Sequence, residues 1–157
     1  MLKAILFALL LPVSAFAKDS GQLEFSGDFS KITKMSDKSG DDIACVYNSA
    51  KTTIVAGARK KIGDRWPEGF TLQFPADTDL NSEIKIEDED PDRSIAFTTV
   101  EKALWFANSC TVSFATKSKM LNISVACPSV EDMLSPTDAK RTARVKAMLS
   151  CSMSNLD

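Results

Sequence analysis

Four cations and one aromatic residue have the types and spacing that best suit ligand recognition. These candidate binding residues are Arg59, Lys60, Lys61, Arg65 and Trp66. The last two lie in segment 63–69, whose two glycines and one proline predict a turn-rich loop. Cationic groups beside an exposed indole can hold an anionic or sugar-bearing ligand or anchor a protein partner. The alternative is that Trp66 folds back and plugs one end of a sheet, with the charges merely solvating it.

The acidic residues form two groups that carry oxygen ligands of the kind Ca²⁺ takes. They are Asp77 and Asp79, followed by Glu87, Asp88, Glu89, Asp90 and Asp92. Their spacing lacks the glycine and the closing glutamate of an EF-hand. The sequence therefore favours a solvated acidic loop and predicts no metal site. Composition leaves open whether the 87–92 loop binds a cation or faces a basic partner.

The residues needed for common catalytic mechanisms are largely missing. The chain has no histidine, which excludes Ser-His-Asp and Cys-His catalysis, a histidine general base and histidine-containing zinc sites. Ser82 and Lys85 match a Ser-x-x-Lys pattern, but in a strand-like segment this spacing does not place the amine beside the hydroxyl. A glycosidase-like carboxylate pair needs only spatial proximity, and nothing selects two of the 21 acids. We expect no catalytic residue and no cofactor, and we favour a non-enzyme.

The first seventeen residues have the three parts of a secretory signal peptide. A cationic start precedes the apolar run 4–11, and small residues stand at Ala15 and Ala17. The apolar run is shorter than the roughly 20 residues that a membrane anchor needs. We expect cleavage after Ala17, export to the periplasm or the extracellular space, and one domain over 18–157 with no transmembrane span.

All four cysteines lie in the exported part, and their even count predicts two disulfides formed in an oxidising compartment. They are Cys45, Cys110, Cys127 and Cys151. There is no Cys-x-x-Cys pair of the redox kind. A two-residue turn at 118–119 would place Val112 opposite Val125, and Cys110 opposite Cys127, on the buried face of a hairpin. The turn lacks Asn-Gly or Asp-Gly, so a longer loop and a shifted register stay open. These two thiols can bridge each other or reach the other cysteines, so the connectivity stays open as well.

Short segments of alternating apolar residues, separated by turn residues, account for most of the exported chain. Their inward positions are Leu23 and Phe25; Ile43, Cys45 and Tyr47; Phe70, Leu72 and Phe74; Ile84 and Ile86; and Ile95 and Phe97. Runs of this length at fairly even spacing predict a mainly β fold, an antiparallel sandwich or small barrel of short strands stapled by disulfides. An α+β arrangement is the alternative class.

Two segments resist the strand interpretation. Residues 99–108 fit helical spacing, but they also alternate, with Leu104 and Phe106 leading into Cys110, and we favour a strand. Ser135 and Pro136 have the types of a helix N-cap and first turn, and good helix formers follow them. This pattern predicts a C-terminal helix over about 136–149 that packs its small side chains and Met148 against the sheet.

The overall charge narrows the classes of partner. A formal net charge of −2 lacks the basic excess of nucleic-acid binders, so we expect no nucleic-acid partner. The missing catalytic residues and the Arg65-Trp66 pair favour a non-enzymatic exported domain that binds a protein or cell-envelope component through loops at one end of a β scaffold. The alternatives are a carboxylate-dependent hydrolase of cell-wall polymer and an envelope-structural protein without a small ligand. The oligomeric state stays open.

Overall fold

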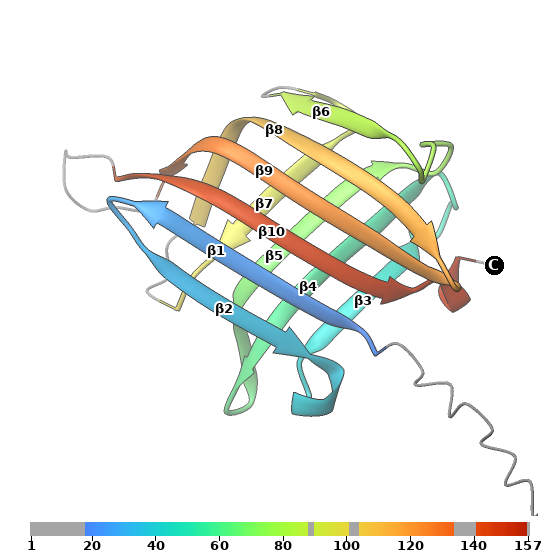
Figure 1. Cartoon of the computed structure of the whole chain (residues 1–157), viewed down its shortest axis with the longest axis horizontal. Coiled ribbons are helices and arrows are strands. Elements are labelled where there is room, and N and C mark those ends of the chain that lie inside the picture. The colour runs from blue at the N-terminus through green and yellow to red at the C-terminus, as the bar shows by residue number, and fades with distance from the viewer. Residues whose placement is uncertain (1–17, 88–89, 101–103, 134–140, 157) are drawn as a thin grey trace, which may run out of the picture.

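The computed structural model of the chain describes residues 18–87, 90–100, 104–133 and 141–156, so the predicted signal peptide lies outside the described residues. Within these residues ten antiparallel strands form one sheet that curls into a nearly closed barrel (Figure 1). The strands are β1 (Ser20–Gly27), β2 (Lys31–Ser36), β3 (Asp42–Tyr47), β4 (Thr53–Ile62), β5 (Arg65–Pro75), β6 (Glu83–Glu87), β7 (Ser94–Thr98), β8 (Leu104–Lys117), β9 (Met120–Asp132) and β10 (Thr142–Ser152). Two 3-10 helices, η1 (Asp37–Ser39) and η2 (Met153–Asn155), follow β2 and β10. The prediction of a mainly β, antiparallel fold is confirmed.

The order of hydrogen-bonded strands is β2-β1-β10-β9-β8-β7-β5-β4-β3, and β6 pairs with β8 outside this path. The sheet therefore ends at β2 and β3, which are consecutive in the chain and joined through η1. We call the region where these two end strands approach each other the seam. The sequence pattern does not predict β2, because its inward side chains, Thr33 and Met35 among them, do not form an apolar run. Among the described residues, no helix is long and apolar enough to cross a membrane.

The predicted C-terminal helix is wrong over its described part. Residues Thr142–Ser152 form β10, which pairs with β1 on one side and β9 on the other. Its buried positions alternate from Ala143 to Cys151, whereas Met148, predicted to face inward, is 52% exposed. Two neighbouring strands offer backbone partners along the whole segment, and this tertiary pairing overrides helix propensity. Residues 136–140, the start of the predicted helix, lie outside the described residues.

The hairpin of β8 and β9 matches its predicted register. Ser118 and Lys119 both have positive φ angles, 51° and 63°, as a two-residue hairpin turn of type I′ requires. Val112 lies opposite Val125. Cys110 and Cys127 form one disulfide, with their Cα atoms 4.2 Å apart, so these thiols bridge each other directly.

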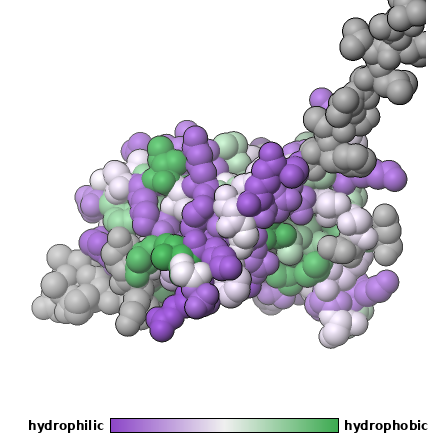
Figure 2. Space-filling view, turned by 90° about the horizontal axis from the view of Figure 1, so that it is seen from below, coloured by the Kyte–Doolittle hydropathy of each residue, from purple (hydrophilic) through white to green (hydrophobic). Residues whose placement is uncertain are grey.

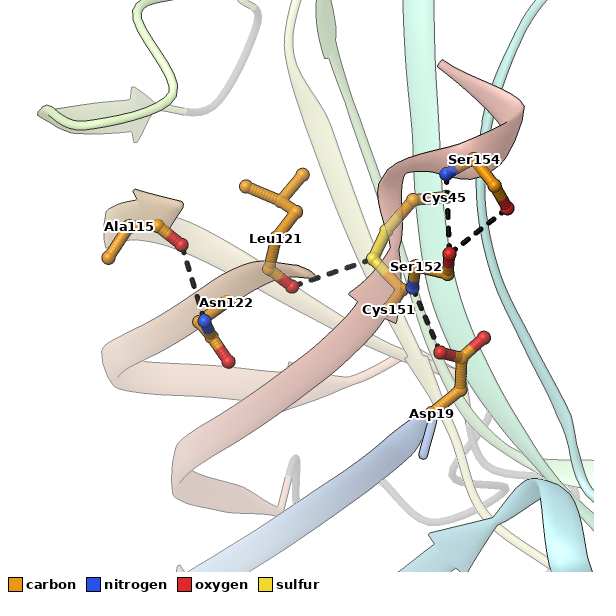
Figure 3. Close-up of a disulfide and its surroundings, with 8 residues drawn as sticks. All are labelled: Asp19, Cys45, Ala115, Leu121, Asn122, Cys151, Ser152 and Ser154. Carbon is orange, nitrogen blue, oxygen red and sulfur yellow. Dashed lines mark hydrogen bonds between the residues drawn. A yellow bond between two sulfur atoms is a disulfide. The ribbon is translucent and has the colours of Figure 1, made fainter. Parts of the chain in front are cut away.

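The second disulfide joins Cys45 in β3 to Cys151 in β10, with Cα atoms 6.0 Å apart (Figure 3). These two strands are not neighbours in the hydrogen-bonded order, so the bridge links parts of the barrel wall that no backbone ladder connects. Next to it, the Cys151 sulfur lies 3.7 Å from the Leu121 carbonyl oxygen, and the Ser152 backbone N–H donates to Asp19 (2.9 Å). The C-terminal end of the chain is thereby held to the start of β1 and to β3.

Large apolar side chains fill the barrel interior. The most voluminous of the fully buried ones are Trp105, Phe70, Phe74, Phe97, Leu23, Ile54, Leu72 and Leu121. The Trp105 ring contacts Phe25 and Phe29, with centroids 5.2 Å and 5.3 Å apart. A packed interior of this kind is a hydrophobic core, so ligand recognition is better sought on the outer surface and the barrel ends.

Segment 99–108 becomes a strand from Leu104 onward, as favoured, but with the opposite face inward at its start. Trp105 is fully buried, whereas Phe106 is 44% exposed. The register between β8 and β9 shifts between Ala107 and Thr111. An extra residue in a strand turns the following side chains to the other face, which explains why Phe106 does not share the inward face of Cys110.

Candidate functional site

The structure places Arg65 and Trp66 at the start of β5 and not in a loop, which corrects the prediction for segment 63–69. The turn between β4 and β5 consists of Gly63 and Asp64. Pro67 is tolerated in the strand because pairing of β5 with β7 begins only at Gly69, so the missing N–H of the proline breaks no bond on that side. The two residues therefore lie on the β4–β5 hairpin, next to its turn.

Gly69 itself is required by a close approach of β5 to β4. Its φ is +155°, and a Cβ at this position would lie 2.1 Å from the backbone oxygen of Ala58. The glycine therefore serves strand packing, which accounts for one of the residues that suggested a loop.

Two of the predicted binding cations are engaged in ion pairs with acids next to β3. The Arg59 guanidinium donates to Asp42 through its Nε (3.0 Å), and the Lys60 ammonium donates to Asp41 (3.0 Å). Arg59 and Asp42 face each other directly in the β3–β4 register. These carboxylates neutralise both cations, so Arg59 and Lys60 contribute little net charge to a binding surface.

The remaining predicted residues gather at the end of the β4–β5 hairpin. The Lys61 ammonium lies 5.9 Å from the centroid of the Trp66 ring, within reach of a cation–π interaction. Trp66 is 42% exposed and Ile62 is 46% exposed, so Trp66 does not plug the barrel. We call Lys61, Ile62, Arg65 and Trp66 the hairpin tip.

The hairpin tip combines exposed apolar surface with cationic charge. In Figure 1 the hairpin projects from the lower end of the molecule, and Figure 2 shows small hydrophobic patches between hydrophilic residues on the face seen from below. The side chain of Arg65 is exposed, and it opposes Ile62 across the hairpin. Such a surface can contact a partner through the indole and meet acidic or hydrogen-bond-accepting groups with the two cations.

Two of the described acids in the acidic segments, Asp79 and Asp90, stabilise turns. The Asp90 carboxylate accepts hydrogen bonds from the backbone N–H groups of Asp92 (3.0 Å) and Arg93 (3.1 Å). The Asp79 carboxylate accepts from the backbone N–H of Asn81 (3.0 Å). In the part of the chain that is described, no three His, Cys, Asp or Glu residues are grouped to hold a metal ion. Asp88 and Glu89 lie outside the described residues.

Two buried acids that sequence reasoning did not single out are also engaged by cations. Glu68 is 3% exposed and accepts hydrogen bonds from the Lys31 ammonium (2.9 Å) and from the Thr33 hydroxyl. Asp132, also 3% exposed, accepts from the Arg141 guanidinium through Nε (3.0 Å). The Lys31–Glu68 pair joins β2 to β5, and the Arg141–Asp132 pair lies at the end of β9. Both carboxylates therefore have a structural role.

Asp41 is the acid most closely tied to the seam. Its carboxylate accepts hydrogen bonds from the backbone N–H groups of Ser36 and Lys61, each at 2.8 Å, and from the Lys60 ammonium. Burial acts to raise the pKa of Asp41, but the hydrogen bonds from Lys61, Ser36 and Lys60 outweigh it and hold the pKa below the ordinary value of 3.8. The ionised carboxylate thus fastens the end of β2 to β4.

We expect Asp41→Asn to lower the free energy of unfolding by about 2 kcal/mol at pH 7, the usual contribution of hydrogen bonds to a charged group. A depressed folded-state pKa stabilises the protein fully above the unfolded pKa of about 3.9, and this stabilisation is lost as the pH falls through the folded value. The difference between variant and wild type should therefore shrink from pH 7 to pH 3 in urea unfolding. A difference that stays constant over this range would contradict the role of the charge.

Comparison of the chain with models of protein families, with curated proteins and with solved structures finds no match. Function is therefore inferred from the residues of the hairpin tip and from the chemistry of the surface around it.

Proposed function

We propose that this chain is an exported, non-enzymatic domain that binds a protein or a cell-envelope component through the hairpin tip. The observation that carries the proposal is the exposed Trp66 on the β4–β5 hairpin, with the Lys61 ammonium over its ring. Tryptophan is enriched among residues that dominate binding energy. A preformed orientation lowers the entropic cost of contacting a partner.

The charges around Trp66 narrow the chemistry of the partner. Asp42 and Asp41 neutralise Arg59 and Lys60, so Lys61 and Arg65 supply the cationic character of the tip, opposed by the exposed Asp64. This balance suits a partner with an apolar contact and a few acceptor groups. It does not suit a densely anionic polymer, which would need a larger basic surface.

The two disulfides support the export part of the proposal. Both are formed between buried cysteines, and such bridges persist in oxidising compartments outside the cytoplasm. The segment 1–17, with its signal-peptide pattern, points to the same route. Periplasm and extracellular space both fit these observations.

The double variant Arg65→Ala, Trp66→Ala tests the proposal. We expect it to keep its unfolding midpoint, because both side chains are exposed, and to lose at least about tenfold in affinity, since one binding anchor contributes about 2 kcal/mol or more. The measurement is cross-linking and pull-down from an envelope extract, followed by identification of the retained proteins.

Phe106→Ala is the matched control, because Phe106 is similarly exposed (44%) but lies on β8. A partner retained by the wild type and by Phe106→Ala, and lost by the double variant, would support the hairpin tip. The same partner retained by all three proteins would refute this location.

A further inference from the structure

A groove of about 600 Å³ lies on the outer face of the sheet, over β1, β2, β8, β9 and β10. Its volume falls in the range typical of small-ligand sites. The outward side chains along it are Ser20, Gln22, Lys34, Ser113, Ala115, Asn122, Ser124, Met148 and Ser150. The groove shares no residue with the hairpin tip, so it is a separate candidate site.

The strand register arranges most of these side chains in two adjacent rows across four strands. One row consists of Gln22, Met148, Ser124 and Ser113, and the next of Ser20, Ser150, Asn122 and Ala115. None of the eight is charged and six end in a hydroxyl or an amide, in a chain with 25% charged residues. The rows form a neutral surface with many short hydrogen-bonding groups.

Part of this hydrogen-bonding capacity is not used by the protein. Ser113 donates to Glu83 (3.0 Å), and the Asn122 amide donates to the Ala115 carbonyl (3.4 Å; Figure 3). The side chains of Gln22, Ser124 and Ser150 make no hydrogen bond within the part of the chain that the structure describes. These groups are available to a ligand.

We propose that this groove binds a neutral oligosaccharide. Uncharged hydroxyl and amide groups in rows complement sugar hydroxyls, which both donate and accept hydrogen bonds. The exposed Met148 (52%) supplies an apolar contact for the C–H face of a sugar ring. Lys34, on β2, is the one charged residue among the described residues that line the groove.

The groove fits a peptide less well. Extended peptides add to the edge of a sheet through backbone hydrogen bonds, and amphipathic helices need a groove with deep apolar pockets. Here the strands β1, β10, β9 and β8 are already paired with a neighbour on each side. The apolar lining residues Phe114, Ile123 and Leu149 are buried, and most outward side chains are short and polar, so the groove offers no deep apolar pocket. Phe114 is the aromatic residue among the described residues that line the groove, and it is only 4% exposed. Little ring surface is therefore available to a sugar, so its affinity should be in the weak range of small polar ligands.

A titration of the isotope-labelled protein, followed by amide NMR shifts, tests the proposal. The probes are maltotetraose and chitotetraose as neutral oligosaccharides, an oligogalacturonate as the charged one, and the peptide Gly-Ser-Gly-Ser. We expect saturable shifts on β1, β8, β9 and β10 around the two rows with at least one neutral oligosaccharide. Shifts with the charged sugar or the peptide alone, or no saturable shift at all, would overturn the proposal.

Two glutamate substitutions on the same face of the sheet test whether binding takes place in the groove. Ser124→Glu puts a charge inside the groove and should weaken binding about tenfold or more, because a ligand would bury that charge without a partner. Ser26→Glu puts the same charge on β1 beyond the groove, opposite Arg144, and should leave binding unchanged. Equal loss in both variants, or in neither, would overturn the site.

Gln22→Ala is a second variant, which adds no charge and should also weaken binding. It tests the groove independently of whether Ser124→Glu folds correctly. The Arg65→Ala, Trp66→Ala protein should bind the oligosaccharide like the wild type. Failure of the sugar site and failure of the hairpin tip are thus distinguished by separate variants.

Discussion

Replacing Cys45 and Cys151 together by alanine is expected to lower the free energy of unfolding by about 5 kcal/mol, against about 3 kcal/mol for Cys110 and Cys127. The first bridge closes a sequence separation of 106 residues and the second one of 17. A cross-link restricts the unfolded chain more when it closes a longer loop. All four cysteines are at most 2% exposed, so both double variants lose similar packing. The difference between their free energies of unfolding therefore reflects the lengths of the two loops.

The place of the long bridge in the fold strengthens this expectation. Cys110 and Cys127 lie on β8 and β9, which the hairpin ladder already holds together. Cys45 lies on β3, an end strand whose hydrogen-bonded neighbour is β4, and Cys151 lies on β10. Without this bridge, β3 should lose amide protection before the β8–β9 hairpin does.

The measurement is urea unfolding of the two double variants, with hydrogen exchange as the local readout. A loss of about 5 kcal/mol is a large share of the stability of a typical domain, so the Cys45, Cys151 variant should be unfolded well below the wild-type midpoint. Equal losses of unfolding free energy in both variants, or a larger loss for Cys110 and Cys127, would show that loop length does not determine how much each disulfide stabilises the fold.

Local pattern offered the register of the β8–β9 hairpin because both strands alternate, and the two-residue turn of the structure selects that register. The opposition of Val112 and Val125 follows from residues that are close in sequence. The same reasoning fails for β10, where local propensity favours a helix while the alternation from Ala143 to Cys151 fits a strand equally well. The pairing with β1 decides between them, and β1 lies more than 100 positions earlier in the chain.

The candidate sites also differ in whether they depend on residues that are close in sequence or on the pairing of distant strands. The sequence selected Lys61 and Trp66 as candidates, but it predicted a loop over 63–69, and the two-residue turn of the β4–β5 hairpin brings them together. The neutralisation of Arg59 by Asp42 depends on the β3–β4 register, which the turn between those strands does not reveal. The groove depends on still more distant pairing, since its rows bring Ser20, Asn122 and Ser150 together from three parts of the chain.

The two tryptophans illustrate how a single strand irregularity changes an interpretation. Trp66 stands out in the sequence because cations and turn residues surround it. Trp105 lies in an alternating run whose pattern predicts that its neighbours Leu104 and Phe106 face inward. The register shift in β8 reverses that assignment and makes Trp105 a central core residue. A bulge leaves no reliable trace in a single sequence, so the face of this segment was not predictable.

Trp105→Ala is therefore expected to lower the free energy of unfolding by about 4 kcal/mol, as full truncation of a buried aromatic residue does. The ring is fully buried against Phe25 and Phe29, and the Arg141 guanidinium lies 5.4 Å from its centroid. Truncation leaves a cavity in the barrel interior and removes the aromatic surface beside Arg141. Trp66→Ala, at an exposed position, should stay within about 0.5 kcal/mol of the wild type.

A third variant separates ring packing from hydrogen bonding at this position. Within the part of the chain that the structure describes, the buried Nε1 of Trp105 has no hydrogen-bond partner, so Trp105→Phe removes a donor without leaving a described acceptor unpaired. It should lower the free energy of unfolding by only about 1–2 kcal/mol, from the smaller ring volume. Urea unfolding of all three variants measures this series. A loss for Trp105→Phe as large as that for Trp105→Ala would mean that the indole N–H has a partner that stabilises the fold, such as a buried water, because a phenyl ring retains most of the packing but none of the hydrogen bond.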